Sequence, residues 1–188
     1  GPMAYRVHIY TFHAFCNEII QNNLDFFGKR ELEPISELEQ VVLLEDLIDS
    51  LDPKHPVRRL KGDVYFEVPR LQDLFRKMKE EDWTPDLVTS SIDAYLAELP
   101  EREEYLYKKV NAKRGIKQGD LKEALYQKEA DRMELLKAAA LLFPTYQEMM
   151  KERGRYDYSD MILWVLEAFK ADPELLMRYQ EQYLYFLV

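Results

Sequence analysis

The chain has 188 residues, of which 47% are hydrophobic and 32% charged, and its formal net charge is −9. This size suits one domain or a domain and a half, with a real hydrophobic core. The single cysteine, Cys16, excludes an internal disulfide and favours a reducing compartment such as the cytoplasm. No apolar run approaches the roughly 20 residues that a membrane span needs, so we expect no membrane partner.

The opening residues predict a strand that leads into a helix. Residues 1–3, Gly-Pro-Met, look like a protease-cleavage remnant and an added start methionine, so we leave them out of the fold. Residues 5–10 alternate polar and apolar side chains, as a strand does. Residues 11–28 then carry apolar side chains at helical spacing, with Thr11 as a natural N-cap and Gly28 as a natural stop.

The middle of the chain predicts a series of helices. They cover residues 37–51, 68–82, 85–98 and about 120–152. Ser36 and Glu39 form a capping-box pattern at the start of the first of them. Pro144 should kink or split the last one, because proline removes a helical hydrogen bond. Residues 99–118 have no clear period and predict a loop or a loose helical hairpin.

The end of the chain predicts two more helices and a strand. Residues 159–170 are amphipathic, and Asp172 followed by Pro173 caps a last short helix. The apolar run at residues 183–188 is typical of a buried strand. Two strands therefore bracket the helices. We predict a mainly α fold, in which a helical insertion subdomain is flanked by two short strands of an α/β domain.

The start of the first helix is a candidate phosphate site. Ligands of α/β sheets gather at the carboxyl ends of strands, and a helix N-terminus offers free N–H groups and a partial positive charge. Thr11 can add a hydroxyl donor, and His13 lies off the apolar stripe and can add an imidazole N–H. The alternative is a capped helix with a surface histidine and no ligand.

Two basic stretches interrupt the acidic chain. Residues 105–117 carry five basic residues and no acid, interleaved with tyrosines, and residues 54–61 carry four basic residues and no acid. Basic residues with aromatic neighbours are typical of surfaces that contact single-stranded nucleic acid. The candidate contacts are Arg58, Arg59, Lys108, Lys109, Lys113 and Arg114. The alternative for the second stretch is a solvated loop whose lysines pair with the acidic run at residues 98–104.

The other candidate sites have simpler interpretations. His8, His13 and Cys16 do not have the spacing of a zinc site, and no fourth ligand is obvious, so we expect no metal. Carboxylate pairs such as Asp157 and Asp160 are expected to cap helices or face solvent. The sequence contains neither a Gly-rich phosphate loop nor a nucleophile motif, so we expect no catalytic residues in this chain.

Two segments resemble UvrD/Rep/PcrA-type superfamily 1 DNA helicases. Residues 11–20, "TFHAFCNEII", resemble the TFH motif of these enzymes, in which a strand leads into a helix beginning Thr-Phe-His. Residues 155–188 resemble the segment that the family places just before its acidic ATPase motif, and residues 157–161 match the D-[FY]-x-[DE]-[LM] pattern of that segment. The resemblance covers both ends of the chain, whereas residues 99–140 look longer and more charged than in the family.

The resemblance implies a fragment of an ATP-dependent DNA helicase and translocase that moves 3′ to 5′. Residues 4–28 and 157–188 would come from the first RecA-like domain of the motor, and residues 29–156 would form its helical subdomain 1B. ATP and Mg²⁺ would bind elsewhere in the parent enzyme, because the Walker lysine and the metal-holding carboxylate match no residue here. We therefore expect no cofactor and no ATP hydrolysis in this fragment alone.

The resemblance also implies roles for single residues. Thr11 and His13 match the family positions that touch the backbone of single-stranded DNA, and Asp157, Tyr158 and Asp160 match a motif with a mainly positional role. The expected partners are single-stranded DNA or a DNA junction, and the remaining domains of the parent helicase. The rival interpretation is a helical protein–protein interaction module whose acidic, tyrosine-rich surface docks a partner.

Overall fold

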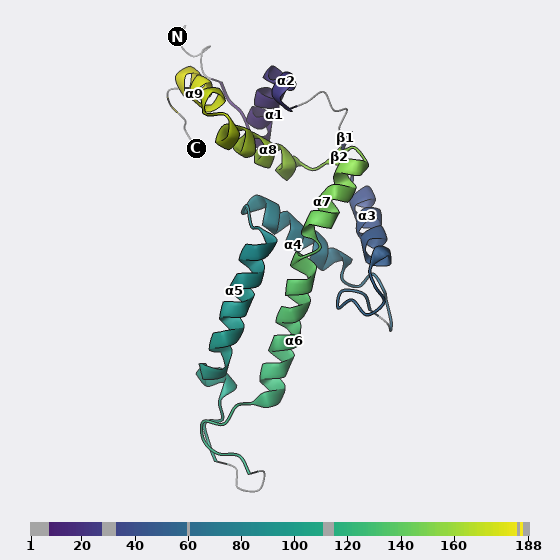
Figure 1. The fold of residues 1–188 in the computed structure, drawn as a ribbon, viewed down its shortest axis with the longest axis vertical. Coiled ribbons are helices and arrows are strands. Elements are labelled where there is room, and N and C mark those ends of the chain that lie inside the picture. The colour runs from purple at the N-terminus through teal and green to yellow at the C-terminus, as the bar shows by residue number, and fades with distance from the viewer. Residues whose placement is uncertain (1–7, 28–32, 60, 111–114, 184, 186–188) are drawn as a thin grey trace. The chain divides into compact units, whose positions relative to one another are not determined.

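The computed structural model describes residues 8–27, 33–59, 61–110, 115–183 and 185. The chain divides into two compact units: unit 1 takes in Gly1–Glu37 and Met150–Val188, and unit 2 takes in Leu38–Met149. The elements of unit 1 are α1 (Phe12–Asn22), α2 (Leu24–Phe27), β1 (Glu33–Pro34), β2 (Arg155–Tyr156), α8 (Tyr158–Ala171) and α9 (Pro173–Gln182). The helices that form unit 2 are α3 (Glu37–Ser50), α4 (Val68–Glu80), α5 (Pro85–Glu98), α6 (Glu123–Ala140) and α7 (Phe143–Glu152), the outer two of which cross its boundaries (Figure 1).

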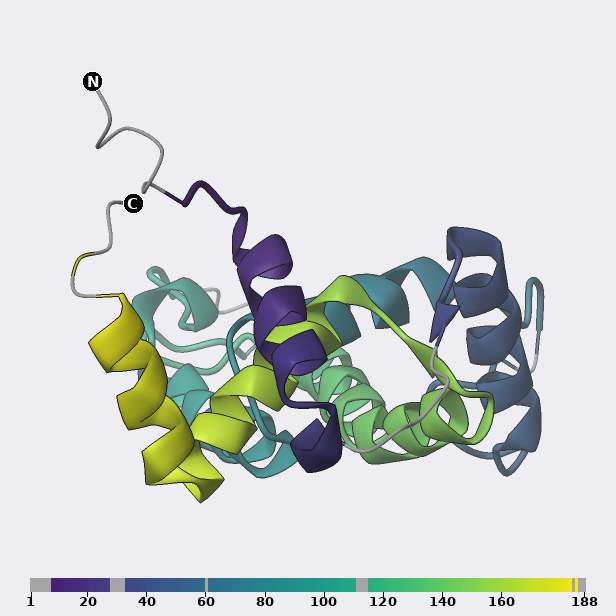
Figure 2. The ribbon, with the colours of Figure 1, turned by 90° about the horizontal axis from the view of Figure 1, so that it is seen from above.

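Unit 1 is built around the packing of α1 on α8. Cys16 and Ile19 of α1 are buried in one cluster with Met161 and Val165 of α8. Figures 1 and 2 both show the two helices side by side. Apolar residues three and four apart fall on one face of a helix, so each helix offers a stripe to the other. This packing fixes the first turns of α1 and α8, where the candidate site lies.

The strands of unit 1 differ from the predicted ones. β1 and β2 pair in parallel, with Glu33 opposite Arg155 and Pro34 opposite Tyr156. The sequence instead predicts strands at 5–10 and 183–188. Residues 8–10, 183 and 185 are not in a strand, and the rest of both segments lies outside the described residues. The mainly helical fold class is confirmed, whereas the flanking strands of an α/β domain stay a prediction.

The core of unit 2 is formed by α3, α4 and the α6–α7 region. Leu43, Leu44, Leu47 and Ile48 of α3 are all fully buried. On α4, Phe75 is 1% exposed, and its ring centroid lies 5.5 Å from that of Phe143 and 4.8 Å from that of Tyr146. Aromatic pairs at these distances add to the burial of the rings themselves.

A long helical hairpin extends from this core. α5 and α6 run side by side, and Lys137 on α6 donates a 2.5 Å hydrogen bond to Asp93 on α5 (Figure 1). The predicted α5, residues 85–98, has the observed bounds, because Thr84 caps it through the N–H of Leu87 and Pro85 begins it. Two short 3₁₀ turns, η2 (Leu99–Glu101) and η3 (Glu103–Tyr105), then end the α5 arm.

The long helix predicted over residues 120–152 is split into two helices near Pro144, which confirms one of the two outcomes expected from this proline. The break comes at residues 141–142, so that Pro144 sits at the second position of α7, where a missing N–H costs little. The first of the two helices starts later than predicted, at Glu123. The Asp120 carboxylate accepts a 2.6 Å hydrogen bond from the Lys117 N–H, which closes a turn at Gly119 (φ +89°) instead of starting the helix.

The predicted helix over residues 68–82 ends two residues early. α4 stops at Glu80, and Asp82 adopts the left-handed conformation with φ 51°. The Trp83 N–H donates to the carbonyl of Met78 and the Asp82 N–H to that of Lys79, which is the hydrogen-bond pattern of a Schellman motif. Asp82 therefore does here what glycine usually does at a helix end.

The thiol of Cys16 is expected to be unreactive in the folded chain. Burial between α1 and α8 raises the pKa of the Cys16 thiol, so little of the reactive thiolate exists near neutral pH. Reaction with Ellman's reagent at about pH 8 should be at least about tenfold slower than that of an exposed thiol. The control is Asn17→Cys in a Cys16→Ala background, since Asn17 is exposed. Equal rates for the two proteins would contradict the burial.

Candidate nucleic-acid interface

The first candidate residue, Thr11, caps α1. Its backbone is extended, and its Oγ1 accepts a 3.1 Å hydrogen bond from the N–H of Ala14. A hydroxyl can accept hydrogen bonds and also donate one. In this cap Thr11 only accepts, so its hydrogen can be donated to another acceptor. Thr11 is exposed. The predicted N-cap is confirmed, and its chemistry is compatible with an anion in front of the helix.

The second candidate, His13, is exposed and forms an aromatic pair. Its ring centroid lies 5.5 Å from that of Tyr158 at an interplanar angle of 65°, an edge-on contact. Tyr158 is 62% exposed and is the first residue of α8. Three of the exposed side chains at the starts of α1 and α8 carry polar groups, namely Thr11, His13 and Tyr158, and we call these three the TFH edge.

A capping box holds Tyr158 in place. The Asp157 carboxylate accepts a 3.0 Å hydrogen bond from the Asp160 N–H, and the Asp160 carboxylate accepts one of 2.8 Å from the Asp157 N–H. Both carboxylates thus serve the backbone of α8, as a capping box does. The interpretation of this pair as helix caps is confirmed, and Tyr158 directly follows the capping Asp157 in the chain.

The far end of α1 is fixed by α9. The Asn23 side chain donates to the carbonyl of Ile19 at 2.7 Å and to the hydroxyl of Tyr179 at 2.8 Å. α1 ends at Asn22 with Asn23 as its C-cap, whereas the predicted stop, Gly28, lies outside the described residues. The helix that carries Thr11 and His13 is therefore held at both ends.

The two arginines of the first basic stretch are bound within unit 2. Arg58 donates from Nη1 to the carbonyls of Leu51 at 2.7 Å and Asp49 at 3.3 Å, at the C-terminal end of α3. A cation there is favourable, because the last carbonyls of a helix carry partial negative charge. Arg59 donates to the Glu67 carboxylate at 2.9 and 3.1 Å. Both arginines thus have structural partners before any ligand binds.

We call residues 106–121, which connect η3 to α6, the strap, and most of the second basic stretch belongs to it. Leu106 and Leu121 form an antiparallel bridge, and the Tyr107 N–H donates to the Asp120 carbonyl. Lys108 and Lys109 are exposed, whereas Lys113 and Arg114 lie outside the described residues. These backbone contacts hold the chain just before Lys108 against the residues just before α6.

The alternative interpretation, in which the lysines pair with acidic residues, is represented by one ion pair that involves a described residue of the strap. The Lys108 ammonium lies 3.8 Å from the Glu103 carboxylate, and both side chains are highly exposed. An exposed ion pair at this distance contributes little, typically below about 1 kcal/mol. The Lys108 charge therefore remains accessible to a phosphate.

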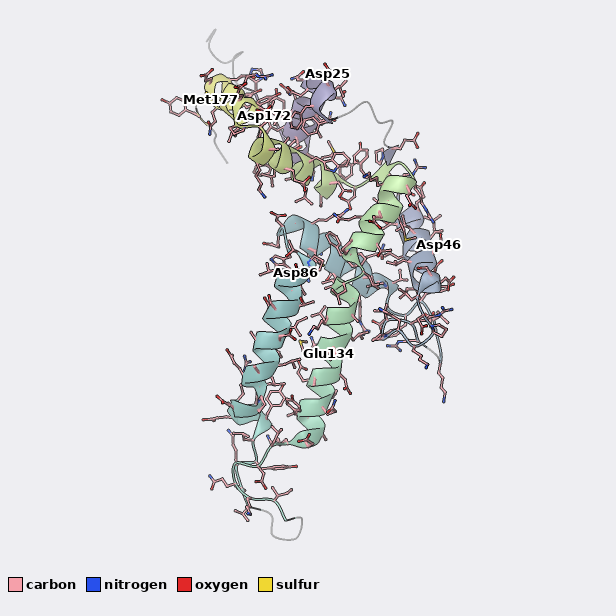
Figure 3. All side chains as sticks on the ribbon, in the orientation of Figure 1. Asp25, Asp46, Asp86, Glu134, Asp172 and Met177 are labelled. Carbon is pink, nitrogen blue, oxygen red and sulfur yellow. The ribbon has the colours of Figure 1, made fainter. Side chains whose placement is uncertain are left out.

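Acidic side chains lie on several helices of unit 2. Figure 3 shows Asp46 on α3, Asp86 at the start of α5 and Glu134 on α6, each on a different helix. Within the described ranges, no three histidine, cysteine or carboxylate side chains are grouped to hold a metal ion. None of the helices in these ranges is long and apolar enough to cross a membrane.

Comparison with known proteins decides the family. Residues 2–188 match the family model described as UvrD/REP helicase N-terminal domain. The chain belongs to this family. It is also 24% identical over 187 residues to the DNA helicase II of Rickettsia typhi, an alignment that takes in 98% of this chain and 22% of that protein. The chain thus spans about a fifth of the length of this relative, and no solved structure matches it.

Within the UvrD/REP framework, the predicted contacts fall into two groups. Thr11 and His13 belong to unit 1 and share the TFH edge, whereas the arginine and lysine candidates belong to unit 2. Sequence reasoning missed Tyr158 as a member of the edge. The sequence did carry a signal for it. A residue that directly follows a capping aspartate lies in the first turn of the helix, and Tyr158 holds this position in α8.

Proposed function

We propose that this chain is a DNA-contacting part of an ATP-dependent 3′ to 5′ helicase, and that it is not catalytic by itself. Its helical unit would correspond to subdomain 1B, and its terminal segments to pieces of the first RecA-like domain. ATP and Mg²⁺ would bind other parts of the parent motor, which would act in the cytoplasm. The partners would be single-stranded DNA or a DNA junction, together with the remaining domains.

The observation that carries the proposal is the TFH edge in a chain of the UvrD/REP family. A hydroxyl donor, an imidazole and an exposed phenol ring lie together at the capped starts of α1 and α8. Such groups suit a phosphate backbone, which is recognised by hydroxyls, backbone N–H groups and helix N-termini without reading the base sequence. We therefore expect weak binding that is independent of sequence and decreases with salt.

Removing the imidazole should weaken this binding. His13→Ala is expected to lower the affinity for a fluorescent oligo-dT several-fold in an anisotropy titration, because one contact to the strand is lost. The fold should persist, since His13 is exposed and makes no core contact. The matched control is Gln21→Ala, an exposed side chain two turns further along the same helix, which should leave the affinity unchanged.

Two outcomes would contradict the role of the TFH edge. One is an equal affinity for His13→Ala and the unmodified chain at low salt. The other is an equal loss in the His13 and Gln21 variants, which would indicate a general effect on α1. Circular dichroism melts of both variants verify that α1 and α8 remain packed.

A further inference from the structure

An exposed phenylalanine in unit 2 is flanked by two arginines. The Arg59 Cζ lies 3.6 Å from the centre of the Phe66 ring, and the Arg70 Cζ lies 4.7 Å from it. Phe66 is 42% exposed, and the arginine side chains are 40% and 63% exposed. Guanidinium groups over an aromatic face attract its quadrupole, so the ring limits where both cations can move.

A buried carboxylate also binds the same two arginines. Glu67 is 4% exposed; its Oε1 accepts from Nε and Nη2 of Arg59, and its Oε2 accepts from Nη1 of Arg70 at 2.8 Å. A buried carboxylate needs such partners, because an unpaired buried charge is strongly destabilising. Ring and carboxylate together fix the positions of two guanidinium groups at the surface.

The residues that hold the two arginines do not follow the usual preferences at a helix start. Glu67 is the N-cap of α4 but makes no side-chain cap hydrogen bond, and Arg70 lies in the first turn of α4, which contains no acidic residue. The helix dipole disfavours a cation there and would favour a capping carboxylate. The carboxylate that could cap the helix is used to hold the arginines instead.

The two guanidinium groups keep donors for a ligand. A guanidinium carries five N–H hydrogens. Arg59 directs Nε and Nη2, and Arg70 directs Nη1, at Glu67. Residues 54–70 contain five lysines and arginines and two acids, a local charge of +3 in a chain of −9. The nearby Asp49 carboxylate already accepts a 2.9 Å hydrogen bond from Tyr65.

We propose that Arg59 and Arg70 form a contact site for the phosphodiester backbone of a nucleic-acid strand. Phe66 and Glu67 are positioning residues, which hold the guanidinium groups ready for phosphate oxygens. Arginine suits this role, because its planar fork matches the geometry of phosphate. The inference rests on the proposed function, and it adds Arg70, Phe66 and Glu67 to the contacts that the basic stretch predicts.

The test compares two arginines on the same helix. Arg70→Gln should weaken oligo-dT binding by the 188-residue chain about eightfold at about 50 mM salt, and should reduce the salt slope by about 0.7, the loss of one phosphate contact. The matched control is Arg76→Gln, which removes the same charge from α4 at an arginine bound to Asp73 and Glu80, with a side chain 53% exposed. The control should change neither the affinity nor the slope appreciably.

A second variant separates positioning from charge. Phe66→Leu keeps every charge and an apolar side chain but removes the ring, so it should weaken binding about two- to fivefold with the salt slope unchanged. A purely structural role for the ring would lower the melting temperature and leave the affinity of the folded chain intact. That result would overturn the positioning role.

Three further outcomes are decisive. If Arg70→Gln behaves like Arg76→Gln while His13→Ala still weakens binding, this site is wrong and the proposed function stands. If Arg70→Gln weakens the binding of polyglutamate as much as that of oligo-dT, the site recognises acidic peptides and the phosphodiester assignment is wrong. If the unmodified chain binds no oligo-dT at low salt, this site and the proposed function are both wrong.

Discussion

Reversing four positive charges of the strap is expected to abolish measurable DNA binding. The variant replaces Lys108, Lys109, Lys113 and Arg114 by glutamate. If each residue neutralises one phosphate, the salt slope should fall by up to about 3, and the affinity at about 50 mM salt should fall at least about a hundredfold. Anisotropy titrations of oligo-dT over a range of salt concentrations measure both quantities. The effect exceeds that of any single contact, because four attractions become four repulsions.

A control on the same hairpin separates a local effect from a change of net charge. Lys128 and Arg132 are exposed on α6 and lie outside the strap in the chain. Reversing these two should weaken binding much less than reversing Lys108 and Lys109 alone, which removes an equal charge. Under the rival interpretation, a protein–protein interaction module, both double variants bind DNA as the unmodified chain does. That outcome would favour the rival.

The largest expected loss of stability comes from the core of unit 2. Phe75→Ala removes a ring that is 1% exposed and packs against Phe143 and Tyr146. Truncating a buried phenylalanine costs about 3–5 kcal/mol, because apolar burial is lost and a cavity remains. Domains are typically stable by only about 5–15 kcal/mol, so a large share of the free energy of unfolding should disappear.

The two tryptophans allow this loss to be assigned to one unit. Trp83 follows α4 in unit 2, and Trp164 lies in α8 of unit 1. In a Trp164→Phe background, urea unfolding followed by fluorescence reports on unit 2 through Trp83. The control is Leu141→Ala, since Leu141 is 55% exposed and should cost less than about 1 kcal/mol. Equal midpoints for the Phe75 and Leu141 variants would contradict the observed core.

The helices were largely predictable, because their signals are local. The threonine-proline start of α5 sets its first residue whatever its surroundings, and Asp172 caps α9 through the N–H groups of Glu174 and Leu175. The predicted helix bounds are wrong where an unusual backbone conformation or a local turn sets the end of the helix. Asp82 in the left-handed conformation ends α4 early, and the Asp120 turn delays α6. Neither residue carries the usual sequence signal of its role.

The short parallel strands could not be predicted in the same way. Glu33 and Arg155 are 122 positions apart, and two-residue strands show no alternation to detect. The side chains of these two residues also form an ion pair, which requires the fold to bring them together. An apolar run such as residues 183–188 gives a stronger strand signal, yet its described residues are not in a strand.

The candidate site was predictable in part for the same reason. The cap at Thr11 and the exposure of His13 follow from helical spacing alone. The contact of His13 with Tyr158 does not, because it depends on α1 packing against α8. The run of basic residues at 54–61 made Arg58 and Arg59 candidate contacts. Only the fold gives their partners, which are backbone carbonyls for Arg58 and a buried carboxylate for Arg59.

The salt dependence of DNA binding by the unmodified chain tests the central claim most directly. We expect oligo-dT and a mixed-sequence strand of equal length to bind with similar, weak affinity. The logarithm of the association constant should fall linearly with the logarithm of the salt concentration, by about 0.7 for each phosphate contacted. Undetectable binding at low salt, or an affinity that does not change with salt, would contradict a role in contacting single-stranded DNA.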